Sequence, residues 1–323
     1  MADARGHGSG ISNESRQVLA LEREAVDLVD RMPELLMEAD RIASTVAQGI
    51  HGRRRAGPGE TFWQFRQYQA GENATLVDWR RSASSDHLYI REREWEAAHT
   101  LHLWPDISPS TNFQSHIAPV SKRDRVLVLT LAAAELLVRG GERVALLAQM
   151  SPTASRNAAT RIAETIASHS RSEAMQSGLP PKASLSRFSG LILFSDFLSP
   201  PDVIRERLEG FAGNGVAGHM VQVLDPAEET LPYHGRTEFL SPSGGERWVA
   251  DRVEALRPKY RARFEAHRAE LAEMAKRFGW SFLTHHTDRP ASEPLLSLLM
   301  RLQGSTSGYK WMAGSSDAME RAP

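Results

Sequence analysis

The stretch "TLHLWPDISPS", residues 100–110, joins a strand-like run to a polar turn. Thr100 to Trp104 are apolar or strand-prone, and Pro105 ends the run. Asp106, Ser108 and Ser110 then follow at every second position. Alternate residues of an extended segment point to the same side, so three oxygen-bearing side chains can converge on one hard cation. The same residue types form ordinary turns and helix caps, and the spacing alone leaves both interpretations open.

The segment after this stretch alternates apolar strands with helices. Apolar runs predict further strands at 143–150, 189–197, 217–225 and 280–285, and helical periodicity predicts helices at 123–141, 156–170, 201–212, 248–278 and 292–302. Continuous apolar strands that alternate with helices are typical of a parallel sheet covered on both faces. The sequence therefore predicts an α/β fold with a doubly wound, mostly parallel sheet. Residues 226–247 read as a hairpin insertion in one crossover.

The chain before this domain has a different character. Residues 1–15 are rich in Gly and Ser and are predicted to be a disordered tail. Residues 16–56 form an N-terminal helical segment, in which Pro33 is expected to separate two helices. Residues 57–98 are aromatic and strand-prone, and we expect a small β block there. The α/β domain then spans 99–303, and 304–323 are predicted to be a flexible tail.

Carboxylates follow several of the predicted strands. Asp106, Asp196 and Asp225 each come directly after an apolar run. In open parallel sheets, ligands bind beyond the carboxyl ends of the strands, near the point where the strand order reverses. Asp196 can therefore supply charge behind a cation held by the 106–110 turn. Mg²⁺ needs only one or two carboxylates, because it keeps several waters, so the set is chemically sufficient.

Composition excludes several function classes. The chain of 323 residues has a hydrophobic fraction of 41% and no cysteine, which excludes disulfides, zinc thiolates, iron–sulfur clusters and a cysteine nucleophile. Lys plus Arg (39) nearly balances Asp plus Glu (40), so no nucleic-acid partner is expected, and "HGRRR" at 51–55 reads as a solvated loop. No signal peptide or membrane span is apparent, and a cytoplasmic protein without membrane insertion is expected.

Catalytic signatures are not found in the sequence. There is no Walker motif, no G-x-G-x-x-G, no G-x-S-x-G and no H-E-x-x-H. A haloacid dehalogenase-type phosphatase needs a second Asp two residues after the first, and Ser108 stands there. No nucleophile is paired with a base at a recognisable spacing. These absences favour binding over catalysis.

Two sets of residues carry a resemblance to known families. D-x-S-x-S after the first sheet strand, with Asp196 in "LFSDF", resembles the von Willebrand factor type A fold and its metal-ion-dependent adhesion site. The block "GPGETFWQFRQYQAGENATLVDWRRSASSDHLYIREREWE", residues 57–96, resembles the signature of the domain-of-unknown-function 58 family. The matching positions are Gly59, Phe62 or Phe65, Arg66, Tyr68, Gly71, Asp78, Trp79, Ser82, Ala83, Leu88, Arg91, Glu92 and Glu94. The resemblance covers about residues 50–303.

The resemblance implies a metal site and a partner. Asp106, Ser108 and Ser110 match the first metal-binding loop and Asp196 the third, with Mg²⁺ or Mn²⁺ as cofactor. The second-loop Thr matches either Thr153 or Ser155 in "SPTASRNAA". Members of the family are commonly encoded beside MoxR-type AAA+ ATPases and are thought to act with them on client proteins. The implied function is a non-enzymatic, metal-dependent protein-binding adaptor.

The signature block also has a physical interpretation of its own. Charged residues are dense there among aromatic ones, which suits either a rigid structural corner or an interface. The candidate partner-binding residues are Arg66, Tyr68, Asp78, Trp79, Arg91 and Glu92. Two alternatives to the adaptor stay open: a metal-assisted hydrolase that uses Asp106 and Asp196, and a structural partner with a vestigial metal site.

Overall fold

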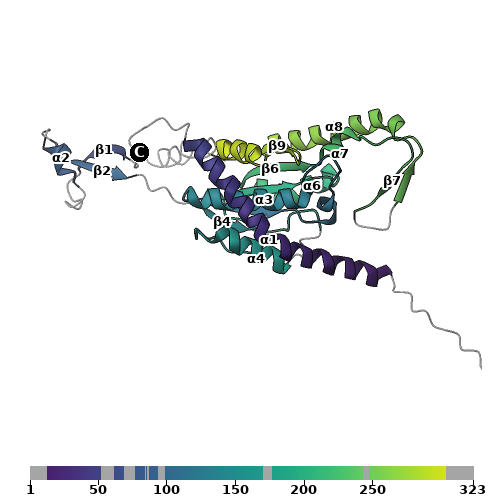
Figure 1. The fold of residues 1–323 in the computed structure, drawn as a ribbon. Helices are drawn as coiled ribbons and strands as arrows, with labels where there is room; N and C mark the ends of the chain where they lie inside the picture. The colour runs from purple at the N-terminus through teal and green to yellow at the C-terminus, as the bar shows by residue number, and fades with distance from the viewer. Residues whose placement is uncertain are drawn as a thin grey trace, which may run out of the picture. The chain divides into compact units, whose positions relative to one another are not determined.

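The computed structural model describes residues 13–51, 62–68, 77–83, 85, 87–93, 99–169, 177–242 and 247–302 (Figure 1). The chain divides into two units. The larger one comprises Met1–Gly49 and His99–Pro323, and the smaller one comprises Ile50–Ala98. The predicted flexible tail, 304–323, and residues 1–12 of the predicted disordered tail lie outside the described residues.

A five-stranded parallel sheet forms the centre of the larger unit. Its strands are β3 (Thr100–Pro105), β4 (Arg143–Leu146), β5 (Gly190–Ser195), β6 (Ala217–Leu224) and β9 (Ser281–His286), in the order β4-β3-β5-β6-β9. Every neighbouring pair runs parallel. The prediction of an α/β fold with a parallel sheet is confirmed.

Helices cover both faces of this sheet, which explains why its strands are apolar throughout. All six residues of β5 are buried. Leu191 and Leu193 pack with Met220 against α6 (Pro201–Gly213) and α8 (Val253–Arg277). Since strand side chains alternate, the residues between them face the other side, where α3 (Lys122–Arg139) lies across four strands with α4 (Ala158–His169) beside it. A further helix spans residues 292–302.

The predicted hairpin insertion lies between β6 and α8. It contains α7 (Pro226–Thr230) and the antiparallel strands β7 (Thr237–Leu240) and β8 (Arg247–Ala250). The stacked rings of Phe239 and Trp248 join the two strands across the hairpin. Because β8 uses residues 247–250, α8 begins at Val253, later than the predicted 248.

The helix α1 (Asn13–His51) contradicts the prediction for Pro33, because it runs through this proline as one helix. Its buried residues recur every three or four positions on both sides of Pro33: Leu28, Met32, Leu35, Ala39, Ile42 and Val46. This stripe packs on the rest of the larger unit over α3 (Figure 1), where Arg31 binds Asp124 at 2.7 Å and Arg139 binds Asp40 at 2.8 Å. Continuous packing on one face outweighs the single hydrogen bond that a proline removes.

The smaller unit contains an antiparallel pair of strands. These are β1 (Phe62–Gln67) and β2 (Tyr89–Arg93), with the short helix α2 (Trp79–Ser82) between them in the chain. Val77 also pairs with Ile90, and both side chains are buried. The predicted small β block is therefore present.

Gly218→Ala is predicted to be strongly destabilising, because a Cβ at this position in β6 would lie 1.9 Å from the Trp280 indole. Trp280 is buried and donates a hydrogen bond from Nε1 to the Val216 carbonyl, so it cannot move aside freely. We expect a loss of about 3 kcal/mol in the free energy of unfolding, measured by urea denaturation. The matched control is Gly210→Ala in α6, where a Cβ meets nothing within 4 Å and a gain of about 0.5–1 kcal/mol is expected. Equal midpoints for the two variants would contradict the prediction.

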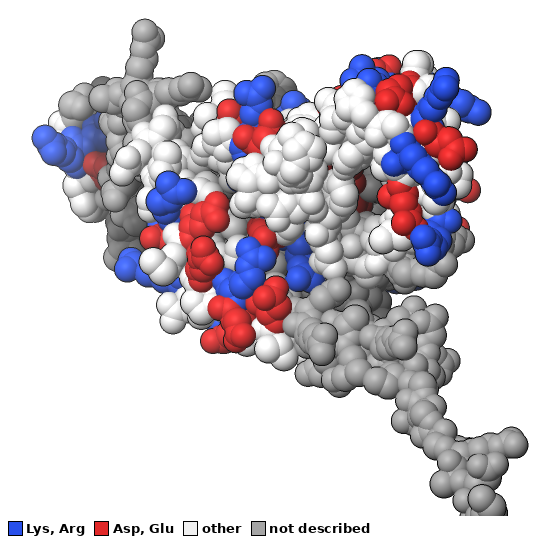
Figure 2. All heavy atoms as spheres, turned by 45° about the vertical axis from the view of Figure 1, so that its right-hand side comes forward, with Lys and Arg blue, Asp and Glu red and all other residues white. Residues whose placement is uncertain are grey.

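The described surface of the protein carries both signs of charge. Figure 2 shows Lys and Arg side chains interspersed with Asp and Glu on one face of the molecule. Within the described residues, no helix combines the length and the apolar character that crossing a bilayer requires.

Candidate metal centre

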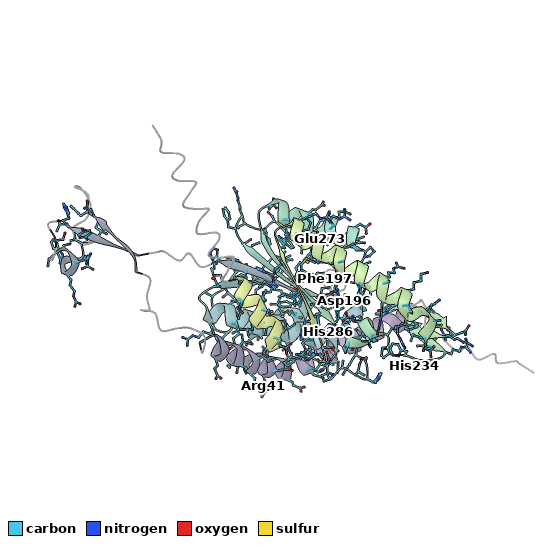
Figure 3. The ribbon with its side chains drawn as sticks, turned by 90° about the horizontal axis from the view of Figure 1, so that it is seen from above. Arg41, Asp196, Phe197, His234, Glu273 and His286 are labelled. Carbon is cyan, nitrogen blue, oxygen red and sulfur yellow. The ribbon has the colours of Figure 1, made fainter. Side chains whose placement is uncertain are left out.

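The ends of β3 and β5 meet at the point where the strand order reverses. β3 is the first strand of the sheet along the chain, and its neighbours β4 and β5 continue the chain on opposite sides of it. Asp106 directly follows β3, and its backbone N–H donates to the Phe194 carbonyl at 2.8 Å, which extends the β3–β5 ladder by one bond. Asp196 directly follows β5, and Figure 3 labels it beside Phe197. Open parallel sheets bind ligands near such reversals of strand order.

The 106–110 turn brings its three oxygen-bearing side chains together. One carboxylate oxygen of Asp106, Oδ1, accepts the Ser108 backbone N–H at 2.9 Å, and the Ser108 and Ser110 hydroxyl oxygens lie 3.1 Å apart. Ser108 also precedes a short 3-10 helix (Pro109–Asn112) without capping it through its side chain, and Thr111 donates its hydroxyl to the Ser108 carbonyl. Asp106 and Ser108 are buried, while Ser110 is half-buried. The stretch is thus a turn whose side-chain oxygens also converge.

The other carboxylate oxygen of Asp106 is held by β5. Ser195 donates its hydroxyl to Asp106 Oδ2 at 2.6 Å, and the Phe197 N–H donates to the same hydroxyl oxygen at 2.9 Å. Phe197 has φ of +50°, a left-handed conformation that costs free energy outside glycine. These bonds fix the end of β5 against the 106–110 turn. Ser195 was not singled out from the sequence, because a serine inside an apolar strand gives no sign that its partner lies on another strand.

Asp196 is paired with a buried lysine. The Lys122 ammonium donates to Asp196 Oδ2 at 2.9 Å and to Glu228 Oε1 at 2.5 Å, and its side chain is 1% exposed. The other Asp196 oxygen, Oδ1, accepts the Leu198 N–H at 3.2 Å. Lys122 is the first residue of α3, after the cap Ser121. Sequence reasoning missed it, although a cation at a helix N-terminus opposes the helix dipole and so was a usable signal.

Asp225, the third predicted strand-end carboxylate, has a structural role. Its oxygens accept the Ser115 hydroxyl at 2.6 Å, the Ser115 N–H at 2.7 Å and the Ala227 N–H at 2.8 Å. It caps α7 in a reciprocal arrangement in which Glu228 accepts the Asp225 N–H. The cap thereby places Glu228 where its second oxygen meets Lys122.

Negative charge exceeds positive charge in this cluster. Asp106 is buried near Asp196, and Asp196 and Glu228 share one ammonium, that of Lys122. Burial, followed by the charge of Asp196, raises the pKa of Asp106 to about 6, although hydrogen bonds from Ser108 and Ser195 oppose the rise. Burial lowers the pKa of Lys122, but Asp196 and Glu228 outweigh this and raise it overall. The cluster therefore favours an additional proton or cation.

The second-loop candidates lie elsewhere in the structure. Thr153 exchanges both backbone hydrogen bonds with Val144 at 2.8 Å, and Val144 is level with Leu101 near the start of β3. Asp106 lies five residue steps beyond Leu101 along the strand, a distance of about 16 Å. The Thr153 hydroxyl oxygen accepts the Ser155 N–H at 3.2 Å, in the turn before α4. The structure does not bring Thr153 or Ser155 to Asp106.

A different segment approaches the serine pair. A Cβ added at Gly178 would lie 3.3 Å from the Ser108 hydroxyl oxygen, so the backbone of residues 177–179 covers this side of the turn. Gly178 has φ of +65°, which a glycine adopts without strain. The close approach needs the absence of a side chain at residue 178, and this requirement appears only once the fold is known.

The candidate partner-binding residues all belong to the smaller unit. Arg66 lies on β1, and Arg91 and Glu92 lie on β2. The Tyr68 N–H donates to the Leu88 carbonyl at 2.8 Å, next to the strand pair. Asp78 caps α2 by accepting the Arg81 N–H at 3.0 Å, whereas the Trp79 side chain is 63% exposed. Asp78 thus has a structural role, and Trp79 is available for contact.

Within the described residues, no group of three or more His, Cys, Asp or Glu side chains is placed to hold a metal ion. The donor set of Asp106, Ser108 and Ser110 is of another kind, because it contains one carboxylate and two serine hydroxyls. Such a set suits a hard cation that keeps several waters. It does not suit zinc or copper, which prefer nitrogen and sulfur ligands.

Relatives of this chain include mycobacterial proteins that are described as uncharacterized. Uncharacterized proteins of Mycobacterium bovis and Mycobacterium tuberculosis are 25% identical over 284 residues, which is 82% of this chain and 87% of each relative. A crystal structure of the conserved hypothetical protein BatB from Bacteroides thetaiotaomicron covers 64% of this chain and 100% of its own, with 15% identity and a TM-score of 0.39. A crystal structure of an uncharacterized membrane-spanning protein from Vibrio fischeri covers 64% and 97%, with 14% identity and a TM-score of 0.16.

A family match covers most of the chain. The family described as "Protein of unknown function DUF58" matches residues 64–270. The match includes most of β1, all of β2 and the sheet strands β3, β4, β5 and β6, and it ends within α8, before β9. The chain therefore belongs to the DUF58 family of proteins of unknown function.

Proposed function

We propose that this chain is a non-enzymatic, protein-binding adaptor that holds one divalent cation, Mg²⁺ or Mn²⁺. Asp106, Ser108 and Ser110 bind the cation, and Asp196 supplies charge behind it. In this proposal the larger unit is a doubly wound domain of the von Willebrand factor type A kind with its metal-ion-dependent adhesion site. When bound, the cation offers a free coordination position to a carboxylate of a partner protein. The protein acts in the cytoplasm with a MoxR-type AAA+ ATPase on client proteins.

The observation that carries the proposal is the spacing of the two serine hydroxyls beside a buried carboxylate. Two adjacent ligands of an octahedral Mg²⁺ at about 2.1 Å from the ion lie about 3 Å apart. The Ser108 and Ser110 hydroxyl oxygens are 3.1 Å apart. Asp106, which is 1% exposed, places negative charge next to them. This separation is that of a hydrogen bond between the two hydroxyls, and it also matches the separation of two adjacent ligands of one cation.

The contacts of the carboxylates support binding more than hydrolysis. A metal-assisted hydrolase needs a carboxylate that can take a proton from an attacking water. Both oxygens of Asp106 accept hydrogen bonds from Ser108 and Ser195, and Asp196 is bound to Lys122. The hydrolase alternative would need one of these carboxylates to take a proton while it keeps these contacts.

One observation favours a structural partner with a vestigial metal site. The Lys122 ammonium already neutralises Asp196 at 2.9 Å, as a bound cation would. A site whose second carboxylate is paired in this way binds divalent cations weakly or not at all. This second candidate function predicts the opposite result in the metal experiment.

Divalent cations are expected to stabilise the native protein. At a Mg²⁺ concentration ten times the dissociation constant, the free energy of unfolding rises by about 1.4 kcal/mol. The full chain is unfolded by heat with MgCl₂ or MnCl₂ and again with EDTA, and the shift in melting temperature is measured. The double variant Ser108→Ala/Ser110→Ala is expected to lose the shift while keeping its fold.

Ser168→Ala on α4 is the matched control, since Ser168 is exposed and bonds only locally. It should keep the full shift of the wild type. A melting temperature of the wild type that is unchanged by millimolar Mg²⁺ and Mn²⁺ would refute the metal site and leave the structural candidate.

The partner is tested separately with a purified MoxR-type ATPase from the same organism. We expect the tagged full chain to retain this ATPase in Mg²⁺ and to release at least nine-tenths of it in EDTA. The Ser108→Ala/Ser110→Ala variant should fail to retain it in either buffer. Retention that is equal in Mg²⁺ and EDTA would support a structural partner, and no retention in any buffer would refute the ATPase partnership.

A further inference from the structure

The helix α1 carries a second apolar face that no described residue covers. Its inner stripe is buried on the larger unit, as described above. An outer stripe comprises Val26, Val29, Pro33, Leu36 and Met37. Val26 is 61% exposed, Val29 48% and Met37 75%. A helix that needed only to cover α3 would be polar on this side.

The spacing of the outer stripe makes it continuous. At 3.6 residues per turn, Val26, Val29, Pro33 and Met37 fall within one quadrant of the helix surface, and Leu36 lies at its border. Isolated exposed apolar side chains are common on soluble proteins. Four of them, Val26, Val29, Pro33 and Met37, align along three turns of one helix with the half-buried Leu36 beside them, and such a patch is of the kind that marks a binding surface. The geometry is that of a seam for a second helix.

Carboxylates line one side of this stripe. Asp27, Asp30 and Glu34 recur at three- and four-residue intervals, are exposed, and form no ion pair with another described residue. We call these three residues the acidic row. Between Val26 and Gly49 the cations are Arg31 and Arg41. Arg31 is engaged with Asp124, and Arg41, which Figure 3 shows on the outer side of α1, lies about two turns beyond Glu34.

We propose that the outer stripe and the acidic row of α1 bind a basic amphipathic helix of another protein. The partner helix packs its apolar face on Val26, Val29, Leu36 and Met37. Its Lys or Arg side chains pair with the acidic row, which sets its orientation along α1. The surface is separate from the cluster at the ends of β3 and β5, so the proposal does not depend on a bound metal.

The charge pattern disfavours two other occupants. A second copy of this chain would bring its own α1 against the outer stripe. Between Val26 and Gly49 that helix offers only Arg31 and Arg41 to the acidic row, and Arg31 is already paired with Asp124. An anionic lipid surface would be repelled by the same row. A basic helix satisfies both the apolar stripe and the carboxylates.

The experiment titrates the full chain into two fluorescent peptides and follows the anisotropy. One is a designed amphipathic helix with leucines on one face and lysines elsewhere, and the other has glutamates in place of the lysines. We expect the lysine peptide to bind at least tenfold more tightly, and salt to weaken its binding. Val29→Ser/Met37→Ser should weaken binding at least tenfold, and Asp30→Lys/Glu34→Lys at least fivefold.

The matched control is Val203→Ser/Met300→Ser, which removes apolar side chains that are 39% and 56% exposed on other helices. It should bind the lysine peptide like the wild type, and the free energies of unfolding of all variants, measured by urea denaturation, should agree within about 0.5 kcal/mol. Equal binding of both peptides, no binding of the lysine peptide, or equal loss in the control variant would overturn the proposal. Two further results would also overturn it. One is a dimer of the wild type in sedimentation velocity that is lost in the Val29→Ser/Met37→Ser variant, and the other is binding of the wild type to anionic vesicles that is lost in the same variant.

Discussion

Lys122→Met is expected to lower the free energy of unfolding by about 3–5 kcal/mol at pH 7. The Lys122 ammonium is the cation between Asp196 at 2.9 Å and Glu228 at 2.5 Å, and the lysine is fully buried. Removing it leaves two carboxylates in a low-dielectric environment without a counter-charge, which is far more costly than losing a surface ion pair. Urea denaturation, with a check that the m-value is unchanged, measures the loss.

Two further variants separate the charge effect from the loss of side-chain packing. Lys276→Met removes a lysine that is 78% exposed and should change stability by less than about 0.5 kcal/mol. The triple variant Lys122→Met/Asp196→Asn/Glu228→Gln removes the charge of both carboxylates that Lys122 pairs with and should recover at least half of the loss. A Lys122→Met protein within about 1 kcal/mol of the wild type would show that the buried ion pairs do not hold this end of the sheet.

Asp106→Asn is expected to raise the free energy of unfolding at pH 8 by about 3 kcal/mol. Burial and the neighbouring Asp196 raise the pKa of Asp106 from 3.8 to about 6. Each pKa unit corresponds to about 1.4 kcal/mol, so the ionised carboxylate is a net cost above pH 6. An asparagine keeps an oxygen for the Ser108 N–H and can donate to Ser195, without the charge. Chemical denaturation at pH 8 measures the gain.

The difference between Asp106→Asn and the wild type should depend on pH in one direction. Between about pH 4 and pH 6 the folded wild type binds a proton at Asp106 that the unfolded chain does not, so the Asp106 contribution to stability falls as the pH rises through this window. Burial lowers the pKa of His219 to about 4 and that of His285 to about 3, and their contributions change in the opposite direction. Both histidines are present in both proteins, so the difference isolates Asp106.

The control for this experiment is Asp251→Asn, whose side chain is 93% exposed. Its stability relative to the wild type should be the same at pH 4 and pH 8. If Asp106→Asn is destabilised at pH 8 by as much as at pH 4, the charge of Asp106 is not the cost that its burial implies. The hydrogen bonds to Ser108 and Ser195 would then dominate.

Much of the fold could be predicted because it depends on local patterns. The five strands of the sheet were found from runs of apolar residues, since a strand buried on both faces must be apolar throughout. The prediction that Pro33 separates two helices was wrong because it used only a local preference of proline. A proline's preference to end a helix is weaker than the burial of an apolar stripe that continues on both sides of it.

The candidate site was predictable only where its residues are neighbours in the chain. The Asp106–Ser108–Ser110 turn is set by a two-residue spacing, and the structure brings the three side chains together. The assignment of Thr153 or Ser155 depended on where a loop folds relative to a strand. The pairing of Val144 with Thr153 places the loop that contains Thr153 and Ser155 near the start of the strands. The segment that approaches Ser108 is the one around Gly178.

The sequence by itself determined the parallel α/β architecture, the turn that gathers oxygens after the first sheet strand, and the family signature in the smaller unit. Tertiary structure decided the electrostatic state of the site. Lys122 and Glu228 are 106 residues apart, and Lys122 and Asp196 are 74 apart, so no local pattern could show that the two carboxylates share one buried ammonium. The physical reason is that propensity and periodicity act over a few residues. The pairing of buried charges is settled by how strands and helices from distant parts of the chain pack together.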